Sequence, residues 1–185
     1  MPRAHRPLPD YLAPNLGILF VGINPGLRSA ALGHHYAGHS NRFWKLLSEA
    51  RLVPFPLGYE DDRRLPQWGI GLTNLTTRST AEAKELTEHD YARGRRTLLR
   101  NVSRYRSKAV VLLGMGLYAV LFPNEPAAIG RKPGLQPSKL CGSDVILLPN
   151  PSGRNAAYPY RAMLEGFLML SHYLPKPDRA PGEES

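Results

Sequence analysis

The sequence has little cysteine and no long hydrophobic run. Its single cysteine, Cys141, excludes an intramolecular disulfide framework and argues against a thiolate metal site. No apolar segment approaches the length that spans a bilayer, and Arg3 and Arg6 are followed by prolines rather than by the apolar stretch of a signal peptide. The histidines lack metal-ligand spacing. We therefore expect a cytoplasmic protein that uses no membrane, metal or cofactor.

Phosphate-binding motifs and acidic residues are also scarce. Neither G-x-G-x-x-G nor G-x-x-x-x-G-K-[ST] follows a predicted strand, which disfavours a nucleotide-binding enzyme. Only 15 Asp and Glu stand against 24 Lys and Arg, so the net charge is +9 and the pI is near 9.9. A basic excess favours polyanionic partners such as nucleic acid. Charge alone leaves open a basic protein that has no such partner.

Length and local composition predict one domain with a tail at each end. The 185 residues suffice for one domain with a buried core. Residues 1–14 and 175–185 contain prolines and lack periodicity, so we expect flexible N- and C-terminal tails around a domain of residues 15–174. Within that domain, four continuous apolar runs predict strands buried on both faces, at residues 16–21, 69–75, 108–113 and 144–148.

Helical periodicity separates the predicted strands. Apolar spacing predicts helices at residues 43–50 (with Ser40 as N-cap), 115–122 and 156–173. A further helix, at residues 87–106, carries an arginine face that can track phosphates or form an ordinary solvated surface. Strands that alternate with helices predict a three-layer α/β/α sandwich with a largely parallel sheet. The arginines of that face are Arg93, Arg96, Arg100 and Arg104.

Two polar loops follow predicted strands. The first strand leads into Gly22-Ile23-Asn24-Pro25-Gly26, and the fourth leads into Pro149-Asn150-Pro151-Ser152-Gly153-Arg154. Ligands bind beyond the carboxyl ends of parallel strands, so we expect both loops on one rim. Pro25 stiffens the first loop and its glycines permit close approach, which lets Asn24 and backbone N–H groups meet a planar ligand. By itself, the pentapeptide is more typical of an ordinary strand-exit turn.

Longer motifs favour the ligand-binding interpretation. The first loop continues with Leu27 and is followed by Gly33, Tyr36, Ala37 and the run Asn41-Arg42-Phe43-Trp44-Lys45. Together with Asn150-Pro151-Ser152-Gly153, these motifs resemble the mismatch-specific uracil-DNA glycosylases, the bacterial branch of the thymine-DNA glycosylase family. The resemblance covers residues 16–172. It implies the α/β/α fold of uracil-DNA glycosylases, in agreement with the strand and helix pattern.

The resemblance implies a monofunctional DNA glycosylase of base excision repair. Such an enzyme flips uracil out of the duplex, especially from G·U mismatches, and hydrolyses its N-glycosidic bond; thymine and other damaged bases stay open as substrates. Its partner is double-stranded DNA, and we expect a monomer that is nucleoid-associated when bound. No lysine occupies a nucleophile position in the two motifs, so we expect no strand cleavage through a Schiff base. The alternative is a non-catalytic module that recognises mismatches on the same scaffold.

The resemblance also implies roles for individual residues. Asn24 positions the attacking water, and Tyr36 stacks on the extruded base. The N–H groups of Ile23 and Gly26 bind the uracil carbonyls, on which negative charge develops as the base departs. The second loop leads into the segment that enters the duplex and contacts the widowed guanine. Its DNA-binding residues are Asn150, Ser152, Gly153, Arg154 and Asn155.

Three positions depart from the family pattern. Arg154-Asn155-Ala156 replace an apolar wedge followed by Ser-Arg, so Arg154 either fills the gap left by the flipped base or stays a solvated charge. Arg28 replaces a small residue, where it would contact DNA phosphate or narrow the site. His34-His35 replace a different pair, and a solvated or locally hydrogen-bonded role is favoured for them over substrate contact.

A cluster of acids precedes the arginine-rich helix. A favourable interaction with the helix N-terminus explains these residues. A second interpretation has Asp90 reach the pocket to activate water or to stabilise the sugar cation. The acids are Glu82, Glu85, Glu88 and Asp90.

Overall fold

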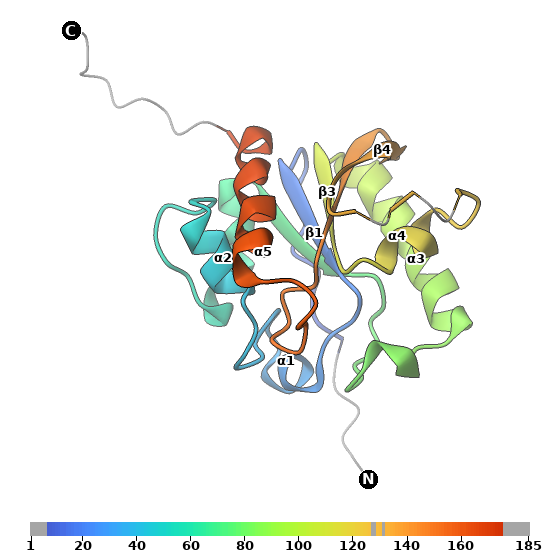
Figure 1. The fold of residues 1–185 in the computed structure, drawn as a ribbon, viewed down its shortest axis with the longest axis horizontal. Coiled ribbons are helices and arrows are strands. Elements are labelled where there is room, and N and C mark those ends of the chain that lie inside the picture. The colour runs from blue at the N-terminus through green and yellow to red at the C-terminus, as the bar shows by residue number, and fades with distance from the viewer. Residues whose placement is uncertain (1–6, 127–128, 131, 176–185) are drawn as a thin grey trace, which may run out of the picture.

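A five-stranded sheet runs through the middle of the molecule (Figure 1). The computed structural model describes residues 7–126, 129–130 and 132–175. The strands are β1 (Ile18–Gly22), β2 (Ile70–Asn74), β3 (Ala109–Leu113), β4 (Gly134–Leu140) and β5 (Ser143–Leu148). They lie in the order β2-β1-β3-β5-β4, and all pairs are parallel except β4 with β5 at one edge.

Helices cover both faces of this sheet. They are α1 (Leu27–Leu32), α2 (Phe43–Glu49), α3 (Glu88–Tyr105), α4 (Leu117–Leu121) and α5 (Tyr160–Leu168), with the 3-10 helices η1 (Tyr59–Trp68), η2 (Ala83–Glu85) and η3 (Met169–Tyr173). One hydrophobic core joins the sheet to α2, α5 and η1, and a second core joins its other face to α3 and α4. The layers are visible in Figure 1. The predicted three-layer α/β/α sandwich is therefore confirmed.

The side chains of β1 show why continuous apolar runs form the central strands. Ile18 and Phe20 lie in the core with α2 and α5, whereas Leu19 and Val21 lie in the core with α3 and α4. All four are at most 1% exposed. Successive side chains of a strand point to opposite faces, so a strand that is covered on both sides must be apolar throughout. The four predicted strands are confirmed for this reason.

The edge strand β4 is not predicted from the sequence. Its side chains alternate between exposed and partly buried, and it contains Pro137. Its pairing with β5 shifts register between Leu135 and Lys139. Proline cannot donate to a sheet ladder and is tolerated at edges and irregular positions. A search for continuous apolar runs therefore misses this strand.

The predicted arginine-rich helix is confirmed as α3. Thr87 is its N-cap, and the Thr87 side chain accepts the backbone N–H of Asp90. Leu98 and Val102 are buried, whereas the four arginines of the predicted outer face are exposed.

The N-cap expected at Ser40 is wrong. Arg42 precedes α2, and the first free N–H of that helix, on Phe43, is accepted by the side chain of Asn41 at 2.9 Å. The last helix is shorter than expected, since α5 begins after Pro159 and the chain continues as the 3-10 helix η3.

The expectation of a flexible tail at residues 1–14 is wrong for the part that the structure describes. Over residues 7–14 the chain packs on the domain, because Leu8 is buried and Tyr11 forms an isolated bridge with Leu72 of β2. Two backbone hydrogen bonds of 2.8 and 3.0 Å join the bridged residues. Residues 1–6, and residues 176–185 of the expected C-terminal tail, lie outside the described residues.

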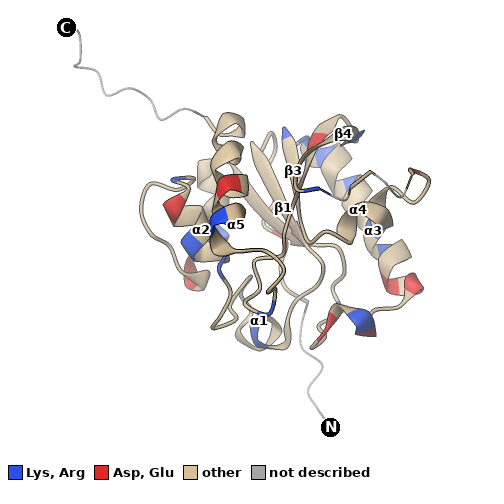
Figure 2. Ribbon diagram, viewed as in Figure 1, with Lys and Arg blue, Asp and Glu red and all other residues tan. Residues whose placement is uncertain are grey.

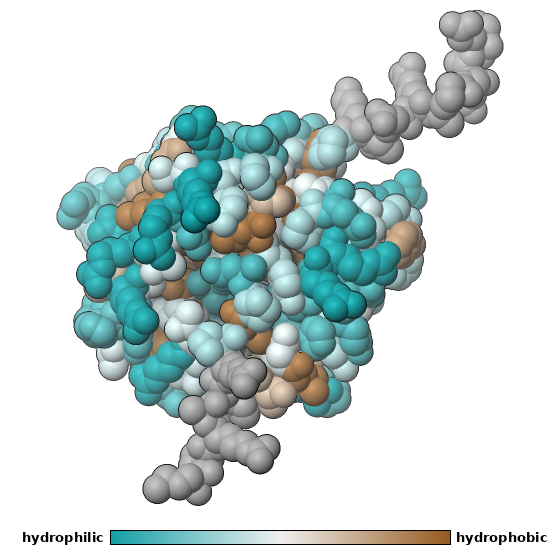
Figure 3. Space-filling view, turned by 180° about the vertical axis from the view of Figure 1, so that it is seen from behind, coloured by the Kyte–Doolittle hydropathy of each residue, from teal (hydrophilic) through white to brown (hydrophobic). Residues whose placement is uncertain are grey.

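The surface is polar and its positive charge is dispersed. Lys and Arg are spread over α1, α2 and α3 rather than gathered at one place (Figure 2). The face seen from behind is largely hydrophilic, with small and separate apolar areas (Figure 3). Within the described ranges, none of the helices has the length and apolar character needed to cross a membrane.

Candidate active site

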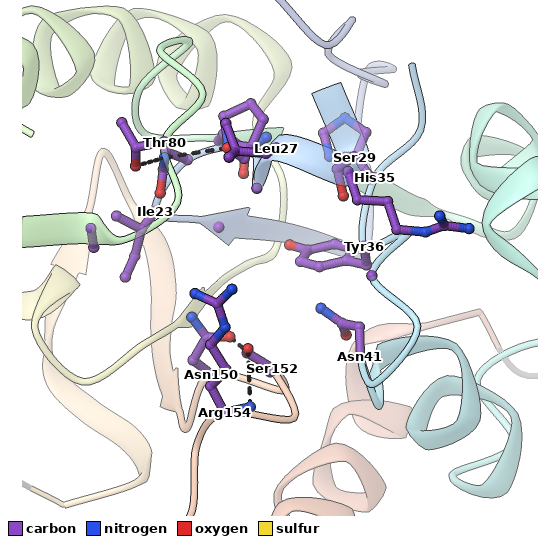
Figure 4. Close-up of a pocket in the computed structure, with 18 of the residues that line it drawn as sticks. Ile23, Leu27, Ser29, His35, Tyr36, Asn41, Thr80, Asn150, Ser152 and Arg154 are labelled. Atoms are coloured by element: carbon purple, nitrogen blue, oxygen red, sulfur yellow. Dashed lines mark hydrogen bonds between the residues drawn. The ribbon is translucent and has the colours of Figure 1, made fainter. Parts of the chain in front are cut away.

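A cavity of about 670 Å³ lies at the carboxyl ends of the strands. Its walls come from the loop after β1, the segment around Tyr36, residues 80–83 after β2 and the loop after β5. In Figure 1, α1 and the loop after β5 lie together at this edge of the sheet. The two polar loops therefore share one rim, as expected. The predicted site residues that line the cavity are Ile23, Asn24, Gly26, Arg28, Tyr36, Asn150, Ser152 and Arg154. Figure 4 labels Ile23, Tyr36, Asn150, Ser152 and Arg154 among them.

Gly22 lets two polar side chains approach the start of the first loop. It is in register with Asn74, the last residue of β2. A Cβ atom at Gly22 would lie 2.5 Å from Asn74 Oδ1 and 3.2 Å from Tyr36 Oη. Asn74 lines the cavity although it is not a predicted site residue. The rule that ligands bind beyond strand ends, applied to the second strand as well, would have found it.

The side-chain amide of Asn24 has a fixed orientation. Its Nδ2 donates to Thr80 Oγ1 at 2.7 Å and to the Arg78 carbonyl at 3.1 Å. The Thr80 hydroxyl donates its own proton to the Glu82 carbonyl at 2.8 Å, so it accepts from Asn24. A carbonyl can only accept, so the amide nitrogen and not its oxygen must face Arg78. Both amide protons are therefore engaged, and Oδ1 is the atom that can accept a hydrogen bond from a ligand or water.

The peptide groups of the first loop also have a defined direction. The Gly22 carbonyl accepts the N–H of Leu75 at 2.8 Å, and the Pro25 carbonyl accepts the N–H of Thr80 at 3.3 Å. In a trans peptide the C=O and N–H bonds point in opposite directions. The N–H groups of Ile23 and Gly26 therefore point away from residues 75–80.

Tyr36 presents an aromatic ring to the cavity. One face of the ring stacks on Phe43, with centroids 4.1 Å apart and planes inclined by 23°. Its hydroxyl is buried and has no hydrogen-bond partner among the described residues. Burial raises the pKa of the Tyr36 hydroxyl, so this group stays protonated at neutral pH. The ring is thus supported from behind and can offer its cavity side to a planar ligand.

Arg28 lies at the cavity but holds the protein's own backbone. Its Nε donates to the Ala37 carbonyl at 2.8 Å, and the Ala37 N–H donates to Ser29 Oγ at 3.0 Å. Arg28 and Ser29 both belong to α1, and their contacts fix Ala37, the residue that follows Tyr36. The side chain stays exposed, so a phosphate contact by Arg28 is still a prediction.

The second loop is shaped by its own side chains. Asn150 Oδ1 accepts the Ser152 N–H at 2.9 Å, and Asn155 Nδ2 donates to the Asn150 carbonyl at 3.0 Å. Arg154 reaches across to the segment after β2, where its Nη1 donates to the Ala81 carbonyl at 2.9 Å. Gly153 and Asn155 do not line the cavity. A Cβ atom at Gly153 would collide with Ser40, so this glycine lets the second loop touch the segment before α2.

The structure does not bring Asp90 to the cavity. Its Oδ2 accepts the backbone N–H and the hydroxyl of Thr87, each at 2.9 Å, and Arg78 Nη1 at 3.1 Å. These contacts, led by the Thr87 N–H, hold the pKa of Asp90 below its usual range. The carboxylate therefore completes a capping box at the start of α3, in line with the helix-terminus interpretation of the acids. Within the described ranges, no group of three or more His, Cys, Asp or Glu could hold a metal ion.

The fold and the cavity define an α/β protein with a ligand-sized site between an aromatic ring and two polar loops. The family model of the Uracil DNA glycosylase superfamily matches residues 9–168 of this chain. The chain therefore belongs to this family. The resemblance stated from the motifs is thereby confirmed.

One relative and one solved structure show what the chain is similar to. It is 33% identical over 160 residues to the G/U mismatch-specific uracil DNA glycosylase of Schizosaccharomyces pombe. The match covers 82% of this chain and 48% of the relative, so the chain spans about half of that protein's length. A solution structure from Methanosarcina acetivorans, described as a candidate uracil DNA glycosylase, has a TM-score of 0.62 at 18% identity. It covers 91% of this chain and 98% of the other, which confirms the fold.

Proposed function

We propose that this protein is a monofunctional DNA glycosylase that hydrolyses the N-glycosidic bond of uracil in duplex DNA, especially in G·U mismatches, as a step of base excision repair. The observation that carries the proposal is the fixed amide of Asn24, which presents Oδ1 as a hydrogen-bond acceptor in a cavity with an aromatic wall. The name of the Schizosaccharomyces pombe relative supports the choice of substrate.

The aromatic wall serves to retain a flipped base. Rotating a base out of the stack costs a few kcal/mol, and less when the base is mismatched. Stacking on an aromatic side chain returns about 1–3 kcal/mol per base. Because Phe43 already supports the ring of Tyr36, little ordering of this side chain has to accompany binding. The base can thus be held outside the duplex long enough for hydrolysis.

The first loop serves to stabilise the departing base. As the glycosidic bond lengthens, negative charge grows on the uracil carbonyls and positive charge grows on the sugar. The N–H groups of Ile23 and Gly26 are fixed donors because their neighbouring carbonyls are bonded to residues 75–80. Donors that need no reorientation stabilise the charged leaving group more than the neutral base, which lowers the barrier.

Asn24 serves to direct the water. Its Oδ1 accepts a hydrogen bond from water and so turns a lone pair of the water toward the anomeric carbon. An amide is not a strong base, so bond cleavage must lead and water attack must follow. No lysine lines the cavity within the described residues, which supports water rather than an amine as the nucleophile.

Double-stranded DNA is the proposed partner. The net charge of +9 supports binding to a polyanion. The exposed Arg154, together with the rest of the loop after β5, provides polar groups at the mouth of the cavity. We further propose that it acts as a monomer, in the cytoplasm and associated with the nucleoid when bound.

The test is excision from a labelled duplex with one G·U pair, followed by alkaline cleavage of abasic sites. The wild-type protein should yield a nick at the uracil position and none in a G·C duplex. Asn24→Ala should slow single-turnover excision by about 100-fold or more, because the water loses its acceptor. Asn101→Ala removes a matched amide on α3, outside the cavity, and should leave the rate unchanged.

Each other outcome has a definite meaning. Duplex binding by the wild-type protein with no abasic product would favour a non-catalytic mismatch-recognition module. Full activity of Asn24→Ala would contradict the role given to this residue. Equal rates on G·U, A·U and single-stranded uracil would contradict the mismatch preference while leaving uracil excision intact.

A further inference from the structure

A buried carboxylate that plays no part in the proposed chemistry lies behind the Tyr36 wall. Asp62, on η1, has a fully buried side chain. A carboxylate without hydrogen-bond donors is strongly disfavoured in a protein interior. The donors that Asp62 receives therefore indicate what it holds in place.

Both oxygens of Asp62 face the two residues that precede Tyr36. Oδ2 accepts the backbone N–H of His35 at 2.9 Å, and Oδ1 lies 3.1 Å from Nδ1 of His34. The ring of His35 is fixed in turn, since its Nε2 lies 2.8 Å from the Pro9 carbonyl. Asp62 thus anchors the N-terminal side of the segment that carries the aromatic ring.

The segment needs such anchors because its backbone is unusual. Tyr36 has φ of +53°, in the left-handed region that non-glycine residues rarely adopt. On the C-terminal side, Ala37 is held by Arg28 and Ser29. Tyr36 therefore lies between two sets of side-chain contacts to the backbone. Figure 4 shows Ser29, His35 and Tyr36 together on one side of the cavity.

We propose that Asp62 is a positioning residue for the reaction, which holds the strained backbone at Tyr36 so that its ring is already in place to receive the flipped base. The inference rests on the proposed function. The Asp62 side chain has no access to the substrate. Its effect on the capture of the flipped base is transmitted through Tyr36.

Two predictions separate this role from a general contribution to stability. Asp62→Ala should slow single-turnover excision of G·U by about 10-fold. The double variant Asp62→Ala with Tyr36→Ala should be no more than about twofold slower than Tyr36→Ala alone, because both changes disable the same wall. Asp62→Asn should keep most of the activity, since its Oδ1 still accepts the His35 N–H and its Nδ2 can donate to Nδ1 of His34.

Hydrogen exchange supplies a readout that does not depend on activity. The amides of residues 34–37 should be protected in the wild-type protein and should exchange faster in Asp62→Ala. Val102→Ala, which truncates a buried side chain of α3 in the other core, is the matched control. It should lower the melting temperature without deprotecting this segment or slowing excision. If Asp62→Ala does not fold, Asp62→Leu repeats the test with the side-chain volume retained.

The outcomes distinguish this inference from the function on which it rests. A wild-type protein that excises no uracil contradicts the proposed function, and the exchange measurement then decides whether Asp62 holds the segment. An active wild-type protein contradicts the positioning role if the effects of Asp62→Ala and Tyr36→Ala multiply. Wild-type protection of residues 34–37 in Asp62→Ala contradicts it as well.

Discussion

Asn24 and Thr80 make the contact that bears most directly on the proposed chemistry. Replacing Thr80 by Val keeps the side-chain shape but removes the acceptor of the 2.7 Å hydrogen bond from Asn24 Nδ2. Losing one such bond costs about 1 kcal/mol and frees the amide to rotate, so we expect excision to slow by about 5-fold. Single-turnover rates on a G·U duplex measure this effect.

Thr80→Ser is the matched control for that change. It restores the hydroxyl and should return the rate close to the wild-type value, while duplex affinity stays constant in both variants. A Thr80→Val enzyme as fast as the wild type would show that Asn24 does not need a fixed orientation.

The ring and the hydroxyl of Tyr36 can be tested separately. Tyr36→Phe keeps the stack on Phe43 and removes a buried hydroxyl that has no partner among the described residues. Its free energy of unfolding should rise by about 1 kcal/mol, because an unsatisfied polar group leaves the interior. Tyr36→Ala removes the stacking surface and should slow excision by about 10- to 100-fold.

Urea unfolding and single-turnover excision measure the two effects side by side. The Phe variant should excise uracil at a rate close to that of the wild type. A large loss of activity in Tyr36→Phe would instead show that the hydroxyl binds the base or an ordered water.

Residues of the site differ in how well their position beside a ligand can be predicted from the sequence. Asn24 and Tyr36 belong to motifs that follow a predicted strand, so their place beside a ligand could be predicted. Thr80 lies 56 residues from Asn24, and Asp62 lies 27 residues from His35. No periodicity or motif marks these two, because their contacts arise only when β2 pairs with β1 and η1 packs beside the sheet.

At the scale of elements, the start of α3 decides the role of Asp90. Its carboxylate accepts the Thr87 N–H and hydroxyl and contacts Arg78, which makes it part of the helix cap. Asp90→Ala should therefore lower the melting temperature by a few degrees and leave excision unchanged. Thermal unfolding followed by circular dichroism, with the G·U assay at a temperature where all variants are folded, tests both statements.

Thr87→Ala removes the other half of the same capping box and should behave alike. A slowing of excision in Asp90→Ala by about 10-fold or more, without a similar loss in Thr87→Ala, would restore the catalytic interpretation.

Elements could be predicted where burial imposes a simple pattern. The central strands are covered on both faces and read as continuous apolar runs, and α3 separates an apolar face from a charged one. β4 and the segment of residues 7–14 lack such patterns, since each is half exposed and contains proline. β4 is placed by its pairing with β5, and residues 7–14 are placed by the bridge to β2. Neither partner can be inferred from the local sequence.

At the scale of the whole molecule, two buried titratable side chains, Asp62 and His35, hold the segment that carries Tyr36. Burial lowers the pKa of His35 below its ordinary value of 6.5, against the opposing effects of Asp62 and Asp10. The folded protein therefore keeps His35 neutral at a pH where the unfolded chain takes up a proton. Desolvation raises the pKa of Asp10. This carboxyl therefore stabilises the folded state only at acidic pH, where carboxyl groups take up protons.

The sign of the resulting pH dependence follows from proton counting. Below about pH 6.5 the unfolded state binds more protons at His35 than the folded state, so the free energy of unfolding falls as the pH decreases from 7 to 5. The slope from this group approaches at most about 1.4 kcal/mol per pH unit.

His35→Gln keeps a side-chain donor for the Pro9 carbonyl and the backbone N–H for Asp62, but it cannot titrate. Urea unfolding at pH 7, 6 and 5 should therefore give a shallower decline for His35→Gln than for the wild type. Parallel curves for the two proteins would show that His35 takes up its proton equally well in the folded state, and that its burial does not govern the stability of the cavity wall.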